Sequence, residues 1–281
     1  MTISACVARA RERLRAAGIG PDEAELDARL LAEHVLGWTT ERFFAESDAP
    51  ASAEFDARFG ALVARREARE PFAYIVGRQE FWGLSFEVSA AVLIPRPETE
   101  LIVESAIAVL HDLPAPLVAD VGTGSGCLAI AIARERPASI VATDVSDTAL
   151  AMARRNAERL KVVDRIAFHR TDLLDGIDAR FDLIVSNPPY VRAGDRAGLQ
   201  PEVRREPDAA LFAGEDGLDV IRRLLAAAVD RLKPGGRLMF EFGYGQDDAV
   251  AELISATAGL RMVALRPDLQ EIPRVAIAAP A

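Results

Sequence analysis

The chain has 281 residues, of which 50% are hydrophobic and 27% charged, as is typical of a folded protein with a well-buried core. Its formal net charge of −10 argues against tight binding to duplex nucleic acid, because that affinity comes largely from neutralising phosphates. No apolar stretch reaches membrane-spanning length and residues 1–15 lack the apolar core of a secretory signal, so we expect a cytoplasmic protein without a membrane partner.

Cysteine and histidine are too sparse to define a site. Cys6 and Cys127 cannot form a disulfide framework, and His34, His111 and His169 lack metal-ligand spacing. We therefore expect no bound metal, and we expect both cysteines to act as small apolar side chains in a reducing compartment.

Residues 1–75 predict a small helical bundle, because their apolar residues recur at helical spacing and no strand pattern interrupts them. The expected helices span residues 6–14, 21–36, 41–45 and 53–67. The stretch holds 10 Lys/Arg and 13 Asp/Glu residues, so it has no basic footprint. The bundle's own core accounts for the apolar stripes, and recognition of a macromolecular partner is a second interpretation.

Between the bundle and residue 110 the pattern changes. Residues 81–88 have the aromatic and β-branched content of a hairpin, with Gly83 near its turn. Residues 94–100 form a proline-stiffened loop that runs into a helix over 101–110. Glu98 and Glu100 fall in the first turn of that helix, where the helix dipole favours carboxylates. This effect alone is enough to explain why acidic residues occur at these two positions.

From residue 116 onward strand and helix patterns alternate, which predicts an α/β fold with a mostly parallel sheet. The expected strands are residues 117–121, 140–143, 165–168, 181–186, 237–242, 262–266 and 275–278. The expected helices centre on residues 129–134, 149–160, 217–232 and 247–257.

A glycine-rich loop follows the first of these strands and opens a helix, and it reads Asp120-Val121-Gly122-Thr123-Gly124-Ser125-Gly126. Its glycines bring bare amides close to a ligand, and the helix N-terminus favours a negative group. Its spacing differs from the dinucleotide fingerprint, and Asp120 would repel a pyrophosphate but attract an ammonium group. A ligand with both an amino group and a carboxylate, such as the methionine part of S-adenosylmethionine, satisfies both features.

Two more acids follow the next two strands. Asp144 lies twenty residues after Gly124, the spacing of an acid that holds ribose hydroxyls. Asp172 could accept from an adenine amino group, with Leu173 lining the ring. Each acid alone would be read as a cap or a loop residue, but three at successive strand ends indicate a nucleoside pocket.

The fourth strand ends abruptly at Ser186-Asn187-Pro188-Pro189-Tyr190, because proline cannot continue the ladder. The Asn187 side chain and the Pro188 carbonyl each offer an acceptor, and Tyr190 offers an aromatic face. Such a set suits a planar group that bears an NH2, as in adenine, cytosine or a glutamine side chain. Asn-Pro and Pro-Pro are also ordinary turn dipeptides.

Together these motifs resemble the seven-stranded S-adenosylmethionine-dependent methyltransferases, and the Asn-Pro-Pro-Tyr signature is shared by enzymes that methylate planar nitrogens. Four further segments are similar to the PrmC/HemK family, which methylates the glutamine of the GGQ motif in peptide-chain release factors. These segments are residues 71–78, 80–83, 94–100 and 210–218.

The resemblance implies a Rossmann-like class I methyltransferase sheet of seven strands with a small N-terminal helical bundle and a linking β-hairpin. The implied domains are residues 1–75, which would dock the release factor, 76–110, which hold the hairpin and linker, and 111–281, which form the methyltransferase domain. We expect a monomer that uses S-adenosylmethionine, yields S-adenosylhomocysteine and makes no direct contact with nucleic acid.

The resemblance also implies roles for individual residues. The cofactor would be held by Gly122, Thr123, Gly124, Ser125, Gly126 and Asp144, and we expect Asp120, Asp172 and Asn187 to bind it as well. Leu173 would lie beside the adenine, where relatives often present a larger aromatic. The glutamine amide would be held by Asn187, Pro188, Pro189 and Tyr190, and the lip of the substrate channel would be Arg96, Pro97, Glu98 and Thr99.

Two alternatives remain at this level. The first is an amino-methyltransferase acting on adenine in DNA or on a ribosomal RNA base, against which stand the acidic charge and the lack of a sizeable target-recognition domain. The second is a non-catalytic binding module of the same fold, against which stands the presence of both the glycine loop and the Asn-Pro-Pro-Tyr segment.

Overall fold

The computed structural model describes residues 1–281, which divide by their contacts into two compact units. The helical unit comprises residues 1–77 and 200–205, and the sheet unit comprises residues 78–199 and 206–281. The β-hairpin and the proline-rich loop over residues 94–100 therefore belong to the sheet unit. The helical unit also contains a short segment from the C-terminal half of the sequence, which no sequence pattern indicated.

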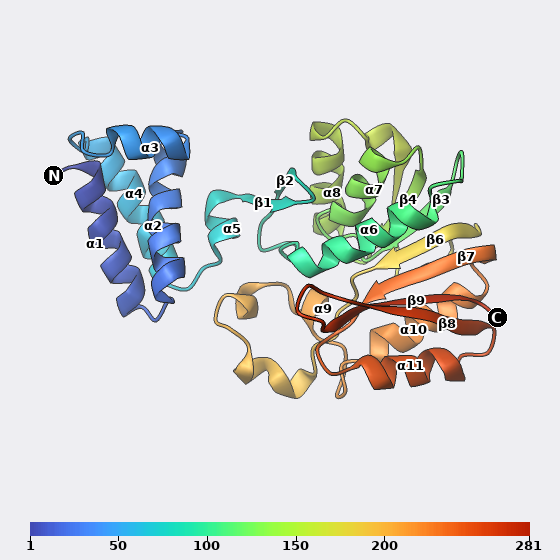
Figure 1. The fold of residues 1–281 in the computed structure, drawn as a ribbon. Coiled ribbons are helices and arrows are strands. Elements are labelled where there is room, and N and C mark those ends of the chain that lie inside the picture. The colour runs from blue at the N-terminus through green and yellow to red at the C-terminus, as the bar shows by residue number, and fades with distance from the viewer. The chain divides into compact units, whose positions relative to one another are not determined.

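The helical unit is built from four predicted helices and one that was not predicted. Its helices are α1 (Ile3–Ala16), α2 (Pro21–Leu36), α3 (Thr40–Glu46), α4 (Ala53–Glu67) and α5 (Phe72–Val76), with the 3-10 turn η4 (Val203–Arg205) (Figure 1). The side chains of Thr2, Thr39 and Ser52 accept hydrogen bonds from backbone amides in the first turns of α1, α3 and α4, which fixes where those helices begin. α2 begins at a proline and ends at Gly37 in the left-handed conformation.

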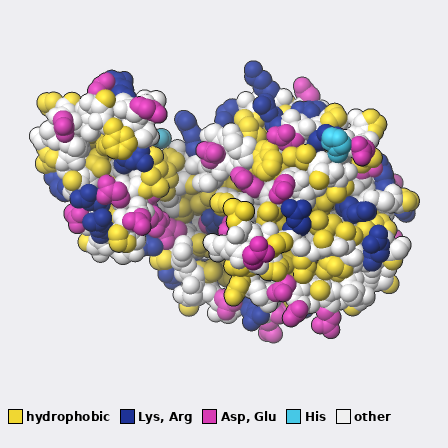
Figure 2. Space-filling view, in the orientation of Figure 1, with side chains coloured by type: hydrophobic (Ala, Val, Ile, Leu, Met, Phe, Trp, Pro, Cys, Tyr) yellow, Lys and Arg dark blue, Asp and Glu magenta, His cyan; other side chains and the backbone are white.

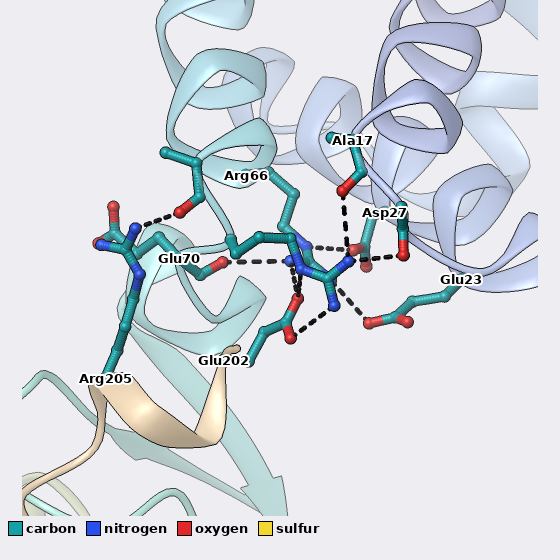
Figure 3. Close-up of polar contacts among 10 residues, drawn as sticks. Ala17, Glu23, Asp27, Arg66, Glu70, Glu202 and Arg205 are labelled. Carbon is teal, nitrogen blue, oxygen red and sulfur yellow. Dashed lines mark hydrogen bonds and ion pairs between the residues drawn. The ribbon is translucent and has the colours of Figure 1, made fainter. Parts of the chain in front are cut away.

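A buried arginine holds residues 200–205 in the helical unit (Figure 3). Arg66 is 1% exposed and donates to Asp27 at 2.6 Å, to Glu23 at 2.7 Å and to Glu202 at 2.6 Å. Arg69 donates to the second oxygen of Glu202 at 2.8 Å. Although burial opposes it, the hydrogen bonds from Arg69 and Arg66 lower the pKa of Glu202. The ionised Glu202 side chain therefore links residues 200–205 to α4 through its ion pair with Arg66.

We expect Glu202→Gln to destabilise the helical unit by about 1–2 kcal/mol at pH 7, because glutamine keeps an acceptor but removes the charge that faces two guanidinium groups. Amide hydrogen exchange within α4 is the measurement, since it reports local opening. Glu25→Gln is the matched control: Glu25 pairs with Arg11 but its side chain is 57% exposed, so little change is expected there. Equal exchange in both variants would contradict this account of the Arg66 cluster.

The sheet unit opens with a hairpin of strands β1 (Arg78–Phe81) and β2 (Leu84–Glu87). Its two-residue turn, Trp82-Gly83, has positive φ at both positions, as a turn matched to the strand twist requires. The hairpin was expected over residues 81–88, so its first strand lies earlier than predicted. Asn156 fastens β2 to the rest of the unit, because its side chain accepts from the Glu87 amide at 2.7 Å and donates to the Glu87 carbonyl at 3.0 Å.

Seven strands form one sheet in the order β5-β4-β3-β6-β7-β9-β8, which confirms the predicted fold class. The strands are β3 (Leu117–Val121), β4 (Ser139–Asp144), β5 (Ile166–Arg170), β6 (Phe181–Ser186), β7 (Leu232–Glu241), β8 (Leu260–Pro267) and β9 (Pro273–Pro280). The first five are parallel, and β9 pairs antiparallel with both β7 and β8. β7 begins at Leu232, before the predicted residue 237, and its pairing with β6 shifts register between Leu232 and Arg237.

Helices pack on the sheet and bury its apolar strands (Figure 1). The helices of this unit are α6 (Glu100–Val109), α7 (Cys127–Glu135), α8 (Asp147–Arg159), α9 (Asp208–Leu211), α10 (Asp219–Val229) and α11 (Asp247–Ala256), with 3-10 turns η1 (Pro97–Thr99), η2 (Val163–Arg165) and η3 (Ala193–Gly198). None of the helices in the chain combines the length and apolarity needed to cross a bilayer.

The strand order sets the place of a ligand site. After β3 the chain winds outward through β4 to β5, and then returns to place β6 on the other side of β3. This reversal leaves a crevice at the carboxyl ends of β3 and β6, which is where open α/β sheets bind ligands.

Candidate functional site

A cavity of about 420 Å³ lies at this reversal point. Its walls come mainly from the loops after β3, β4, β5 and β6, and they also include residues 91–93, 95, 207, 209, 210, 220 and 223. The predicted site residues that line it are Thr99, Asp120, Gly122, Thr123, Gly124, Ser125, Asp144, Asp172, Leu173, Asn187, Pro188 and Pro189. Arg96, Pro97, Glu98, Gly126 and Tyr190 do not line it.

The glycine loop needs glycine for two different reasons. Gly122, Gly124 and Gly126 all have positive φ, a conformation that other residues rarely adopt. A side chain on Gly126 would also come within 3.0–3.1 Å of Ile130 and Ala153, so this glycine permits α7 and α8 to pack. At Gly122 no atom lies within 4 Å of an added Cβ, so the backbone there is open to a ligand.

Asp120 is the next-to-last residue of β3, and one of its carboxylate oxygens is hydrogen-bonded while the other is not. Its Oδ2 accepts from the Thr123 hydroxyl at 2.7 Å and from the Ala129 amide at 3.0 Å. Its Oδ1 is buried and accepts no hydrogen bond. Burial raises the pKa of Asp120 to about 6, against which the bonds from Thr123 and Ala129 act. A buried carboxylate with an unused oxygen suits a ligand that brings a positive charge.

Asp144 shapes the loop as well as lining the cavity. Its Oδ2 accepts from the Gly124 amide at 3.0 Å and its Oδ1 from the Ser146 amide at 2.9 Å. Each carboxylate oxygen can accept a further hydrogen bond, so the side chain can hold the loop and still receive hydroxyl groups.

The third predicted acid is engaged by an arginine. Asp172 pairs with Arg223 at 2.5 Å, and both side chains are about half exposed. Leu173, which follows it, has a left-handed φ of 50° and lines the same wall. Arg223 thus takes up part of the acceptor capacity of Asp172, which no sequence pattern predicted.

Asn187 follows β6, which is tied to β3 by a 2.7 Å hydrogen bond from the Ser186 hydroxyl to the Val121 carbonyl. The Asn187 amino group donates to the Thr99 hydroxyl at 2.9 Å. Its Oδ1 is buried and accepts no hydrogen bond. Asp120 and Asn187, which both line the cavity, therefore each carry a buried oxygen without a hydrogen-bond partner, and so does the Ser125 hydroxyl.

Tyr190 packs against the sheet's core and donates from its hydroxyl to Glu241 at 2.9 Å. The predicted aromatic face is consequently not part of the cavity wall. Arg96 pairs with the buried Glu206, whose other oxygen accepts from the Ile94 amide at 2.9 Å. Of the predicted lip, only Thr99 reaches the cavity, and Pro95 joins it.

Three polar residues that support the site were missed by sequence reasoning. Glu241 and Glu206 are buried carboxylates, and Asn156 donates from its side chain to the Ser125 carbonyl at 2.9 Å. Only Glu241 gave a signal, since it is an acid at the carboxyl end of an apolar strand. The Cys127 thiol also lines the cavity, and burial raises its pKa to about 12, so it stays protonated at neutral pH.

Comparison with known proteins gives matches over most of the chain. A family model described as the PrmC N-terminal domain matches residues 5–77, and one described as the methyltransferase small domain matches residues 101–202. The release factor glutamine methyltransferase of Cereibacter sphaeroides is 46% identical over 259 residues, 92% of this chain and 91% of that protein. The one of Burkholderia pseudomallei is 44% identical over 274 residues, 95% and 94% of the two chains.

Solved structures share the fold at lower identity. The hMettl16 catalytic domain, solved with a MAT2A 3′UTR hairpin, has a TM-score of 0.59 at 17% identity and covers 78% of this chain and 81% of its own. A methyltransferase from Pyrococcus furiosus has a TM-score of 0.51 at 20% identity, with 79% and 98% covered. At this identity the likeness supports the fold alone.

Proposed function

The chain belongs to the release factor glutamine methyltransferase family, and on that premise we propose that it transfers a methyl group from S-adenosylmethionine to the side-chain amide nitrogen of the GGQ glutamine in release factors. The observation that carries the proposal is the buried Oδ1 of Asn187, which has no partner and belongs to a residue that lines the same cavity as the glycine loop. A planar NH2 is the natural donor for that oxygen.

The residues around the cavity fit the cofactor. Asp120 offers its orphaned Oδ1 to the amino group, the open backbone at Gly122 and Gly124 allows close approach, and Asp144 keeps acceptor capacity for ribose hydroxyls. Leu173 and Asp172 would lie along the base. When bound, S-adenosylmethionine supplies an activated methyl group.

The protein's own contribution is to hold the glutamine amide. An amide nitrogen is a poor nucleophile because its lone pair is delocalised into the carbonyl. Hydrogen bonds from its two N–H groups to Asn187 Oδ1 and to the Pro188 carbonyl would raise the electron density on nitrogen and fix its direction of attack. Asn187 cannot take a proton at neutral pH, so the amide proton passes to water, and positioning supplies most of the acceleration.

We assign docking of the release factor to the helical unit, of which residues 5–77 match the PrmC N-terminal model. On the face shown in Figure 2, Lys and Arg side chains are scattered among Asp and Glu side chains and form no continuous basic band. With a net charge of −10, such a surface favours a protein substrate over a nucleic acid.

A methyl-transfer assay with tritium-labelled S-adenosylmethionine tests the proposal. We expect label in an intact release factor, none when its GGQ glutamine is replaced by alanine, and none in DNA or ribosomal RNA. Label in nucleic acid alone would instead identify an amino-methyltransferase of bases. A short GGQ peptide tests the docking role of the helical unit. Equal kcat/KM for the peptide and for the intact release factor would mean that the helical unit does not contribute to docking.

A further inference from the structure

A chain of hydrogen bonds runs from Asn187 into the core. The Asn187 amino group donates to the Thr99 hydroxyl at 2.9 Å, and that hydroxyl is 2.5 Å from Glu241 Oε2. The other carboxylate oxygen, Oε1, accepts from the Tyr190 hydroxyl at 2.9 Å. Thr99 and Glu241 are each 2% exposed, so water does not compete for these bonds.

The number of protons available in this hydrogen-bond network determines which group donates in each bond. A carboxylate only accepts, so the Thr99 hydroxyl gives its one proton to Glu241. The Thr99 oxygen then has only lone pairs to offer to Asn187. The Asn187 amide must therefore present its NH2 to Thr99, which leaves its carbonyl oxygen as the acceptor for a ligand.

We propose that Thr99 and Glu241 are positioning residues for methyl transfer, which set the orientation of the Asn187 amide so that its oxygen, and not its NH2, is available to the substrate. This inference rests on the proposed function. With the amide turned over, the NH2 of Asn187 would meet the NH2 of the substrate glutamine, and two donors cannot bond. Neither Thr99 nor Glu241 needs to touch the reacting atoms.

Both oxygens of Glu241 face hydroxyl donors, Thr99 at Oε2 and Tyr190 at Oε1, which is the arrangement that an ionised carboxylate requires. Burial raises its pKa and the negative charge of Glu98 adds to this, whereas the bonds from Thr99 and Tyr190 and the positive charge of Arg274 lower it. Burial and the Glu241 charge raise the pKa of Tyr190 well above its usual value, so Tyr190 remains a donor.

Three substitutions test the inference. Thr99→Val keeps the shape but removes the hydroxyl, and we expect kcat on the release factor to fall about 10- to 100-fold, with KM and cofactor affinity within about 3-fold. Thr99→Ser restores the hydroxyl and should return kcat to within about 3-fold of wild type. The Gln side chain in Glu241→Gln can donate to Thr99, so that Thr99 can in turn donate to Asn187. This variant should lower kcat as Thr99→Val does.

Ser105→Ala is the matched control, because Ser105 is also a buried hydroxyl on the same helical segment but its oxygen has no hydrogen-bond partner. We expect this variant to keep wild-type kcat. Equal kcat for wild type and Thr99→Val would overturn the inference, as would an equal loss in Thr99→Val and Thr99→Ser.

A second readout separates this inference from the proposed function. In a proton–nitrogen-15 correlation spectrum the side-chain NH2 of Asn187 gives one pair of cross-peaks, and Thr99→Val should shift them while Ser105→Ala does not. If the wild-type enzyme transferred no methyl group to release factors, the proposed function would fail, and these signals would still decide the orientation of Asn187. Signals indifferent to Thr99→Val would overturn the positioning role.

Discussion

Asn187→Ala should lower kcat for release factor methylation by about 10²- to 10³-fold while leaving the affinity for S-adenosylmethionine within about 3-fold of wild type. The magnitude is that of removing one preorganised hydrogen bond from a reacting group. The buried Oδ1 of Asn187, which has no partner in the free protein, is the acceptor that is lost. Single-turnover kinetics and titration calorimetry on the same preparation measure the two quantities.

Asp144→Ala is the complementary control, because its carboxylate holds the Gly124 amide and lines the cavity on the side of the glycine loop. We expect it to weaken cofactor binding by about 10- to 100-fold, the range of a charge-assisted hydrogen bond. At saturating cofactor its kcat should recover most of the wild-type value. Equal loss of binding and turnover in Asn187→Ala would place Asn187 in the cofactor site instead.

The order of the strands and of the longer helices was predictable, because each of these elements has a periodic apolar pattern of sufficient length. α5 was missed, since Phe72–Val76 is only five residues long and rich in residues that favour strands. The start of β7 was placed too late, because Pro234-Gly235-Gly236 has the composition of a turn although the strand continues through it. In both places tertiary context overrides local preference.

The candidate site was predictable as far as its residues follow strands. The glycine loop, Asp144 and Asn187 all lie where a strand of a parallel sheet ends, so the topology brings them to one cavity. The hydrogen bonds that link Asn187 to Thr99 and Glu241 were not predictable. Thr99 and Glu241 are 142 positions apart, and their contact depends on how α6 packs on β7. The same holds for Glu202, which reaches Arg66 across 136 positions.

Asp120→Asn should make the cofactor-free protein more stable at pH 8, by about 1–2 kcal/mol. Burial raises the pKa of Asp120 from 3.8 to about 6, so the folded protein holds this proton more tightly than the unfolded chain. Stability from this group therefore falls as pH rises from about 4 to 6, by up to ~3 kcal/mol. Asparagine avoids that loss but leaves a buried NH2 unpaired, which offsets part of the gain.

The geometry of Asp120 makes asparagine a fair substitute, because both of its hydrogen bonds arrive at one oxygen, Oδ2. A single carbonyl oxygen can accept both. Urea denaturation between pH 5 and 8 is the measurement, with the fully exposed Asp178→Asn as a control expected to stay within about 0.5 kcal/mol of wild type. A gap between Asp120→Asn and wild type that did not shrink toward pH 5 would contradict burial as its cause.

The same substitution should weaken S-adenosylmethionine binding by about 10- to 100-fold, because the carboxylate that faces the cofactor's amino group is gone. Wild-type affinity should itself fall as pH drops below about 6, where free Asp120 takes up a proton, and in Asp120→Asn this pH dependence should vanish. Calorimetry from pH 5 to 8 tests both. A more stable protein that binds its cofactor less well would mean that the unused oxygen of Asp120 is a cost in the free protein, offset only when a cation is bound.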